Sequence, residues 1–298
     1  MKRILQIVDS LEYVTTNSFQ HQLLKTLQRE TDVITIPIDR LSKTLIDGRI
    51  VLICLKLRSV VKHIDLLSKE LTGIPVYVYD QDVWESFMDE GSYKGSYEMI
   101  SSRLSVQSFL NTSHWWANYV RSKGLPSEFV KMWVLPEYCQ THSFSSRIID
   151  VGFMGQMHPF RKQTFEELKD LNLNVQTFLG GPYEMYLQKL SDMKFFIHYE
   201  QDRWHIDGRI IPCNSLYGKT VEVMSRGTFC LRERSDEAVH WNLRDNPLLV
   251  EFSSLNELVE QVKTIKSLDP DLIEKWITKG VEMIKNDSGW KTIVEVLK

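Results

Sequence analysis

The chain has 298 residues, of which 43% are apolar and 25% charged, and its formal net charge is −3. This composition excludes disordered and fibrous proteins and is typical of a globular protein with two domains of ordinary size. The acidic balance creates no general positive field for nucleic acid or an anionic membrane, so any anion-binding site must be local.

The first 14 residues, MKRILQIVDSLEYV, are too short and too polar for a signal or membrane-spanning segment, which needs about 20 apolar residues. The four cysteines are far apart and form no C-x-x-C motif, which favours reduced thiols. Both observations predict a cytoplasmic protein. The cysteines are Cys54, Cys139, Cys213 and Cys230.

Apolar runs of strand length alternate with amphipathic helical patterns through the first half of the chain, which predicts a parallel sheet covered on both faces. We expect strands at 3–9, 31–39, 49–56, 74–80, 105–113 and 128–136, and helices at 17–30, 59–73 and 114–124. Ser18 is the expected cap of the first of these helices.

The same alternation restarts after a polar, turn-rich stretch at 137–147, which is the expected linker. Further strands are expected at 148–155, 174–180, 194–200, 228–233 and 247–252, and helices at 160–171, 183–193 and 217–226, followed by a helical tail from 254. An irregular segment is expected at 199–216. The pattern predicts an α/β fold of two Rossmann-like domains whose parallel sheets face each other across a cleft, with domains at 1–140 and 147–298.

Two turns in the second domain contain candidate ligand-binding residues. Gly155 ends a strand just before a helix whose first turn contains Arg161 and Lys162, a pattern typical of phosphate binding but also of a plain loop with solvated cations. Gly180 and Gly181 follow the next strand, where a bare backbone lets a nucleobase approach; paired glycines also form simple turns.

A third candidate is the stretch from 199 to 227. Its long irregular part contains Arg209, and its helix begins at Tyr217 and contains Lys219 and Glu222. The helix amides and Lys219 favour an anion, whereas a carboxylate one turn later accepts hydrogen bonds from vicinal hydroxyls such as those of a ribose.

The stretches YLQKLSDMKFFIHYE and NSLYGKTVEVMSRGTFCLRE resemble the donor-binding half of GT-B glycosyltransferases of the group-1, family-4-like or CgeB-like kind, with the K-x-x-E-x-x-x-x-G pattern at Lys219, Glu222 and Gly227. The resemblance implies that Glu222 binds the ribose of a nucleotide sugar, most simply a UDP-sugar. It also implies that the Gly155 turn meets the diphosphate and that the loop after Gly180 meets the base. Asn214 stands where retaining members have a second acid, which leaves the anomeric outcome open.

The first domain supplies candidates for catalysis and for acceptor binding. Asp80 and Asp82 end a strand, where a carboxylate with a raised pKa acts as general base, although aspartates there often only cap turns. His114 is an alternative base. The candidate acceptor contacts follow the strands at 3–9 and 74–80 and are Asn17, Ser18 and Trp84.

No His or Cys cluster has zinc spacing, and no P-loop or dinucleotide fingerprint is present, so no metal and no cofactor beyond the nucleotide sugar is expected. The resulting prediction is a metal-independent glycosyltransferase acting on a hydroxyl of a glycan, a metabolite, a protein or a modified DNA base. The net charge does not favour DNA. The alternatives are a non-catalytic nucleotide-sugar-binding protein and a sugar-nucleotide epimerase of GT-B shape.

Overall fold

The computed structural model describes residues 2–80, 82–179, 181–198, 203–212 and 217–297. The chain divides into two compact units and passes between them more than once. Unit 1 comprises Met1–Met132, Asp202–Leu216 and Ser288–Lys298, and unit 2 comprises Trp133–Gln201 and Tyr217–Asp287.

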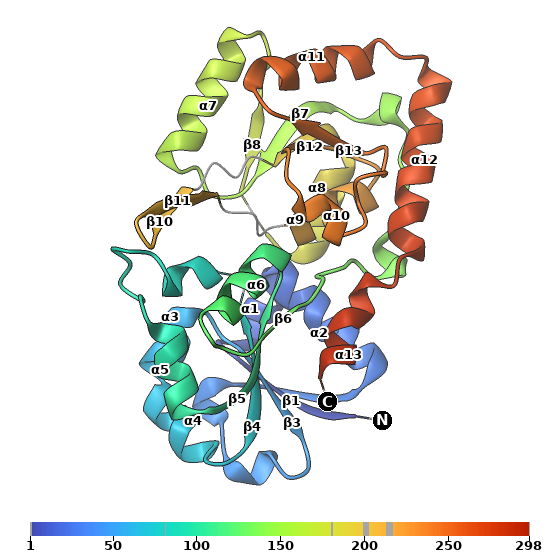
Figure 1. Ribbon diagram of the computed structural model, residues 1–298. Coiled ribbons are helices and arrows are strands. Elements are labelled where there is room, and N and C mark those ends of the chain that lie inside the picture. The colour runs from blue at the N-terminus through green and yellow to red at the C-terminus, as the bar shows by residue number, and fades with distance from the viewer. Residues whose placement is uncertain (1, 81, 180, 199–202, 213–216, 298) are drawn as a thin grey trace. The chain divides into compact units, whose positions relative to one another are not determined.

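Unit 1 contains a six-stranded sheet with the order β2-β1-β3-β4-β5-β6, in which every pairing is parallel. Its central strands are mostly apolar because helices cover both faces (Figure 1), so that Ile4, Leu5 and Ile53 are fully buried. The strands are β1 (Arg3–Val8), β2 (Asp32–Pro37), β3 (Ile50–Cys54), β4 (Pro75–Asp80), β5 (Ser105–Asn111) and β6 (Ser127–Phe129).

The helices of unit 1 begin at side-chain caps in three places. The caps of α1, α2 and α6 are Ser10, Asn17 and Ser113, each of which accepts a hydrogen bond from a backbone amide of the first turn. The helices are α1 (Leu11–Thr16), α2 (Ser18–Glu30), α3 (Leu57–Lys62), α4 (Ile64–Glu70), α5 (Ser96–Arg103), α6 (His114–Ser122) and α13 (Thr292–Val296). Short 3-10 helices lie at η1 (Ile38–Arg40), η2 (Lys43–Leu45), η3 (Val83–Ser86) and η6 (Gly289–Lys291).

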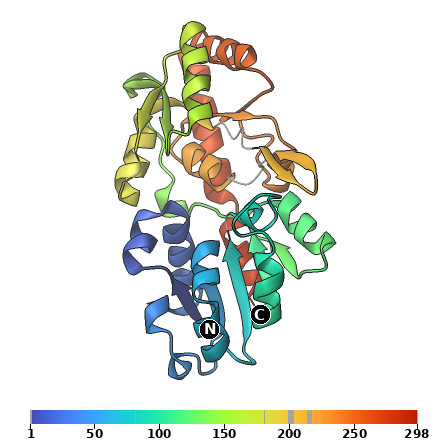
Figure 2. The same cartoon turned by 90° about the vertical axis from the view of Figure 1, so that its left-hand side faces the viewer.

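Unit 2 contains a five-stranded parallel sheet with the order β13-β12-β9-β7-β8. Helices α8 and α9 contact each other beside β9 and β12, and α12 packs against α9 (Figures 1 and 2). The strands are β7 (Ile149–Met154), β8 (Gln176–Phe178), β9 (Met193–His198), β12 (Phe229–Glu233) and β13 (Leu249–Phe252). The helices are α7 (Pro159–Asp170), α8 (Tyr183–Ser191), α9 (Tyr217–Ser225), α10 (Glu237–His240), α11 (Leu255–Lys266) and α12 (Pro270–Asn286), with 3-10 turns η4 (Pro136–Tyr138) and η5 (Phe144–Ser146) in the linker.

The segment expected to be irregular contains an antiparallel hairpin of β10 (Arg203–Ile206) and β11 (Arg209–Pro212). Asp207 and Gly208 connect the strands with φ angles of 51° and 69°. Positive φ at both turn positions is the geometry that gives a two-residue hairpin the right-handed twist of its strands. The expectation of an irregular loop was therefore wrong for these ten residues.

Two parallel sheets with helical covers confirm the predicted α/β class, and three local expectations need correction. The helix expected at 59–73 is two helices separated at His63. The cap of α2 is Asn17 and not Ser18, because the Asn17 side chain accepts from the Gln20 amide. The strand expected at 128–136 extends only over β6. Among the described residues, no helix is both long enough and apolar enough to cross a membrane.

Candidate functional site

In unit 2, the end of β7 and the start of α9 meet at a cationic corner. The Lys219 ammonium donates to the carbonyl of Met154 at 2.7 Å. Gly155 follows with φ of 147°, and a Cβ there would lie 3.2 Å from the Phe153 ring and 3.7 Å from Lys219 Nζ. Glycine is thus favoured by the backbone conformation, and a side chain would be in tight contact with Phe153 beside a positive charge.

Arg161 and Lys162 lie in the first turn of α7, directly after this corner. The Arg161 guanidinium donates to the Gln156 carbonyl at 2.8 Å and lies 5.2 Å from the Phe153 ring centroid. It therefore closes the loop between β7 and α7. Lys162 is exposed. The structure brings Gly155, Lys219 and Arg161 together around Phe153.

Glu222 lies one turn after Lys219 and shares its face of α9, because residues three apart are neighbours on a helix. Its side chain is 1% exposed, and its Oε2 accepts a hydrogen bond from the Tyr186 hydroxyl at 3.1 Å. Burial, followed by the charge of Glu222, raises the pKa of Tyr186 well above its ordinary value, so this hydroxyl remains a donor. The carboxylate is thus held below the surface by α8.

A buried polar cluster, formed by Arg232, His198 and Thr220, was missed by the sequence reasoning. Arg232 Nη1 lies 2.7 Å from His198 Nδ1 and donates to Thr220 Oγ1 at 3.0 Å. Its guanidinium stacks 3.7 Å from the centroid of the Tyr217 ring. These contacts join the carboxyl ends of β9 and β12 to the first turn of α9. A charged residue inside the apolar run FCLRE was the signal that could have revealed it.

The other predicted donor residues lie apart or outside the described chain. Tyr217 is fully buried under Arg232 and belongs to the core of unit 2. Arg209 is exposed on the hairpin, which groups with unit 1. Gly181 has open space at its Cβ position, whereas Gly180 and the departure at Asn214 lie outside the described residues.

In unit 1, Asp80 and Asp82 lie at the carboxyl edge of the sheet. Asp80 is 5% exposed and accepts hydrogen bonds from the Tyr97 hydroxyl at 2.9 Å and the Asp82 amide at 3.0 Å. Those bonds fix Asp80 as an acceptor. Asp82 is partly buried.

Burial raises the pKa of Asp82 from its ordinary 3.8 to about 7, with further contributions from the charges of Asp80 and Glu85, while Lys56 and Arg58 oppose the shift. A carboxyl group with a pKa near neutrality exchanges a proton readily at neutral pH, which is the property required of a general base. Asp82 is therefore better suited to proton transfer than Asp80.

The end of β1 adds more polar groups to this edge. The Lys56 amide donates to Asp9 at 3.0 Å, and the Lys56 ammonium lies 4.4 Å over the ring of Tyr13. Burial and the nearby charges of Asp82 and Asp9 raise the pKa of Tyr13 to about 12. Asn17 donates to the Tyr13 hydroxyl at 2.9 Å in addition to capping α2, whereas the Ser18 side chain lies outside the described residues.

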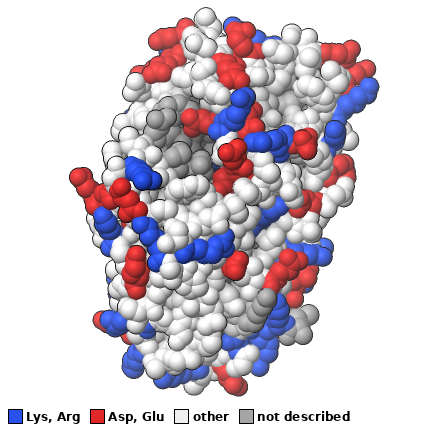
Figure 3. Space-filling view, viewed as in Figure 1, with Lys and Arg blue, Asp and Glu red and all other residues white. Residues whose placement is uncertain are grey.

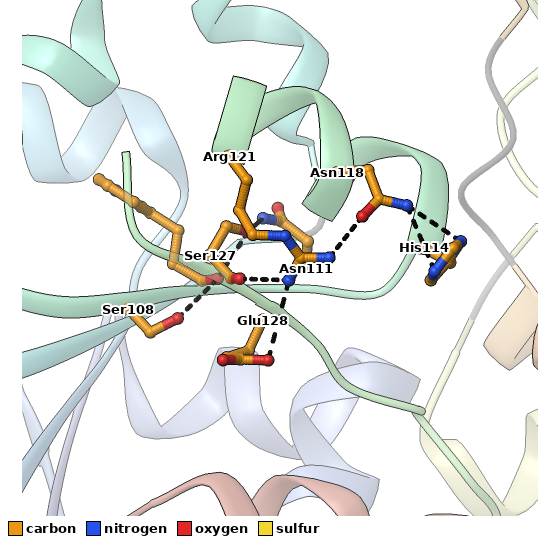
Figure 4. Close-up of polar contacts among 8 residues, drawn as sticks. Ser108, Asn111, His114, Asn118, Arg121, Ser127 and Glu128 are labelled. Carbon is orange, nitrogen blue, oxygen red and sulfur yellow. Dashed lines mark hydrogen bonds and ion pairs between the residues drawn. The ribbon is translucent and has the colours of Figure 1, made fainter. Parts of the chain in front are cut away.

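His114 lies at the start of α6 in a different polar group (Figure 4). Its ring lies within 3.3 Å of the Asn118 amide and packs edge-on against Phe129. Asn118 in turn accepts from Arg121, which donates to the Ser127 carbonyl at 2.8 Å. This arrangement holds the ring against α6.

Asn111 of β5 links Ser127 to the Tyr97 hydroxyl that bonds Asp80. Asn111 donates to Ser127 Oγ at 2.7 Å (Figure 4). Its Oδ1 accepts from the Tyr97 hydroxyl at 3.3 Å. A chain of polar contacts therefore runs from Asp80 through Tyr97 and Asn111 to Ser127. Tyr97, Asn111 and Ser127 are buried, and their contacts hold the Asp80 carboxylate in place.

Trp84 lies two residues after Asp82, in η3. Its ring stacks on Trp204 of the hairpin with centroids 5.9 Å apart and an interplanar angle of 9°. One face of this predicted acceptor contact is therefore occupied by another residue of unit 1. On the face drawn in Figure 3, acidic and basic side chains are interspersed over both units.

Within the part of the chain that the structure describes, no three His, Cys, Asp or Glu side chains come together as a metal site would require. Cys54 and Cys139 are free thiols. Burial raises the pKa of both, that of Cys139 to about 12, so neither is an activated nucleophile.

Comparisons with known proteins identify the fold through structure alone. No protein-family model matches the sequence, and no curated protein matches it. A solved α-glucosyltransferase in complex with UDP-glucose and DNA containing an abasic site has 12% identity and a TM-score of 0.66, covering 99% of this chain and 98% of the other. A DNA-modifying β-glucosyltransferase has 14% identity and a TM-score of 0.64 over 97% and 96% of the two chains.

A third solved structure, HepE of Anabaena in complex with UDP and glucose, has 10% identity and a TM-score of 0.66 over 100% of this chain and 99% of its own. All three are similar over essentially the whole chain. The protein therefore has the GT-B fold, as the resemblance in the sequence implied.

Proposed function

We propose that this GT-B protein transfers a sugar from a nucleotide-sugar donor, most simply a UDP-sugar, to an acceptor hydroxyl. The observation that most strongly supports this proposal is the corner of unit 2, where Lys219 lies beside Gly155 and one helical turn before the buried Glu222. The fold supports the same reading, because its solved neighbours include proteins crystallised with UDP-glucose or UDP.

In this proposal, unit 2 binds the donor. The diphosphate lies against the Gly155 turn, where Lys219 and Arg161 offset its charge. As the bond between the sugar C1 and the diphosphate oxygen breaks, negative charge grows on the departing UDP, and preorganised cations stabilise it most at that moment. Because these cations belong to the chain, the proposal requires no metal. Glu222 orients the ribose side of the nucleotide, with its carboxylate held by Tyr186.

Unit 1 binds the acceptor and supplies the base. Asp82 in its ionised form takes the proton of the acceptor hydroxyl while that oxygen forms a bond to C1 of the sugar. Its pKa of about 7 keeps the proton-accepting form populated at neutral pH and makes it a stronger base than an ordinary carboxylate. Asp80 contributes by accepting a hydrogen bond from the Asp82 amide and by raising the pKa of the Asp82 carboxyl group.

A cytoplasmic location, expected from the sequence, is also part of the proposal.

Calorimetric titration with UDP tests the donor site directly. We expect Lys219→Ala to weaken UDP binding by about ten- to a hundredfold, the effect of removing a charge-assisted contact to phosphate. The matched control is Lys169→Ala, which removes an exposed lysine at the far end of α7. Equal affinities of wild type and Lys219→Ala would refute the proposed diphosphate position.

Catalysis is tested separately by following release of UDP from UDP-glucose with and without acceptors. We expect slow hydrolysis by the wild type, acceleration by the acceptor, and loss of the acceleration in Asp82→Asn. UDP binding without any consumption of a panel of UDP-sugars would indicate a non-catalytic binding protein. Conversion of the sugar within the nucleotide, detected by NMR, would indicate the epimerase alternative.

A further inference from the structure

The β10–β11 hairpin is fixed to unit 1 by hydrogen bonds at its turn. The carboxylate of Asp89 accepts from the amides of Asp207 and Gly208 at 3.1 and 2.9 Å, and the Asp89 amide donates to the His205 carbonyl at 2.8 Å. Asp207 accepts from the Tyr119 hydroxyl at 2.7 Å and from Lys123 at 2.6 Å. The hairpin is thus held from both sides of its turn.

Apolar contacts complete the attachment. Ile206 is 1% exposed and belongs to the hydrophobic core of unit 1, against which Trp204 and Ile211 also pack. Trp204 stacks on Trp84, which follows Asp82 in the chain. The hairpin is therefore a built part of unit 1, although its sequence lies between β9 and α9 of unit 2 (Figure 1).

An open pocket of about 530 Å³ lies between the hairpin and the segment that follows η3. The volume is within the range of about 300 to 1,000 Å³ found for small-molecule sites. All of its described lining belongs to unit 1. The lining residues are Met88, Asp89, Glu90, Gly91, Trp204 and His205.

The chemistry of the lining favours a ring that has both apolar faces and hydroxyl groups. Trp204 and Met88 supply apolar surface, and the exposed side chains of Glu90 and His205 supply hydrogen-bonding groups. A carboxylate accepts from two vicinal hydroxyls, and a pyranose stacks its C–H bonds on an indole. Asp89 and Glu90 repel phosphate, and Lys94 is paired with Asp89 at 3.1 Å. A nucleic-acid backbone is therefore disfavoured here.

We propose that this pocket binds one sugar ring of an uncharged oligosaccharide acceptor. This proposal rests on the proposed function, because the bound sugar is an acceptor only if the protein transfers a sugar to it. Four of the pocket's lining residues, 88–91, follow Asp82 closely in the chain, and its Trp204 stacks on Trp84. We expect Glu90 to contribute most to binding of the sugar, because its side chain is exposed and takes no part in the hydrogen bonds named above that hold the hairpin.

The test is direct binding, which needs no donor. Maltotriose, cellotriose, xylotriose and chitotriose are titrated into the full chain and followed by saturation-transfer NMR and calorimetry. We expect at least one to bind and Glu90→Gln to weaken it about tenfold, as loss of a charged acceptor does. Glu98→Gln, which makes the same change at an exposed position of α5, should leave affinity unchanged. Trp204→Phe keeps a stacking ring on Trp84 and should weaken binding less than Glu90→Gln.

Absence of binding by all four trisaccharides overturns the proposal, as does binding that Glu90→Gln does not alter. Binding of a DNA duplex with an HMU base in place of any saccharide also overturns it. UDP titration on the same sample separates this from failure of the proposed function. If the protein binds a trisaccharide through Glu90 but does not bind UDP, the sugar-binding pocket is supported and the glycosyltransferase function is contradicted.

Discussion

Replacing Asp82 by Asn should make the protein more stable and less active. The carboxyl of Asp82 is recessed beside Asp80 and Glu85, and its pKa rises to about 7. Asparagine has nearly the same shape but no ionised form. The substitution therefore removes the cost of charging this position in the folded protein and, in the proposed mechanism, also removes the base.

The size of the effect follows from linkage between protonation and folding. A carboxyl group with a pKa of about 7 when folded and about 3.9 when unfolded loses up to about 4 kcal/mol of folding free energy on ionisation. Because the folded pKa is the higher one, this stability is complete below about pH 4 and is lost as the pH rises through 7. Asp82 is only partly buried, so we expect a difference of about 2 to 4 kcal/mol near pH 8.

Urea unfolding followed by circular dichroism measures this at several pH values between about 4 and 8, where m-values reveal any change in the unfolded state. The quantity of interest is the difference between Asp82→Asn and wild type, since other titrating groups contribute equally to both. Asp47→Asn, an exposed aspartate of unit 1, is the matched control and should follow the wild-type curve. Acceptor-stimulated UDP release should fall by at least about a hundredfold in Asp82→Asn alone.

Parallel stability curves for wild type and Asp82→Asn would refute the reasoning, because they would mean that folding does not perturb this carboxyl. A variant that gains stability at high pH but keeps full activity would leave the electrostatics intact and remove Asp82 as the base.

Three further expectations follow from other contacts. Gly227→Ala should lower the free energy of unfolding by about 3 kcal/mol or more, because φ is 70° and a Cβ would lie 2.7 Å from Ile277. Gly73→Ala, with φ of 72° and open space around the Cβ position, should lower it by only about 1 kcal/mol. Comparing the thermal unfolding of the two variants separates backbone strain from steric clash. Tyr186→Phe should weaken UDP binding by several fold in calorimetry while costing about 1 to 2 kcal/mol of stability, since Glu222 loses its donor. Arg232→Met should lower the melting temperature at neutral pH, because the contacts of Arg232 with His198 and Thr220 are lost. An unchanged melting temperature would mean that these contacts do not stabilise the attachment of α9 to the sheet.

The alternation of apolar strands and amphipathic helices was sufficient to predict both parallel sheets. The central strands are covered by helices, so their burial appears in the sequence as a mostly apolar run, as in β3. Asp80 and Asp82 were found for the same reason, because polar residues directly after such runs must lie at the carboxyl edge. The raised pKa of Asp82 could not be predicted, since it depends on neighbours brought by other segments.

The misses also have identifiable physical causes. The hairpin carried a signal, the Asp207–Gly208 pair, but its strands are only four residues long and contain charged residues such as Arg209. That Arg209 lies with unit 1 could not be read from its position between two elements of unit 2. Arg232 was overlooked because a lone arginine in a strand gives no indication of the partners it meets across the sheet. The assignment of donor and acceptor to particular side chains stays a prediction.

Unit 1 is assembled from pieces that the ribosome delivers at very different times. Lys2 donates to the carbonyls of Val294 and Leu297 at 2.7 and 2.5 Å, Arg29 stacks 4.8 Å over Trp290, and Ile206 fills the core from the hairpin. The unit that begins first during synthesis therefore cannot finish folding until residues 288–298 have emerged, after the last residue of unit 2. A nascent chain halted after the linker would lack the hairpin and residues 288–298, and the apolar surface that Ile206 covers would be a natural binding place for a chaperone.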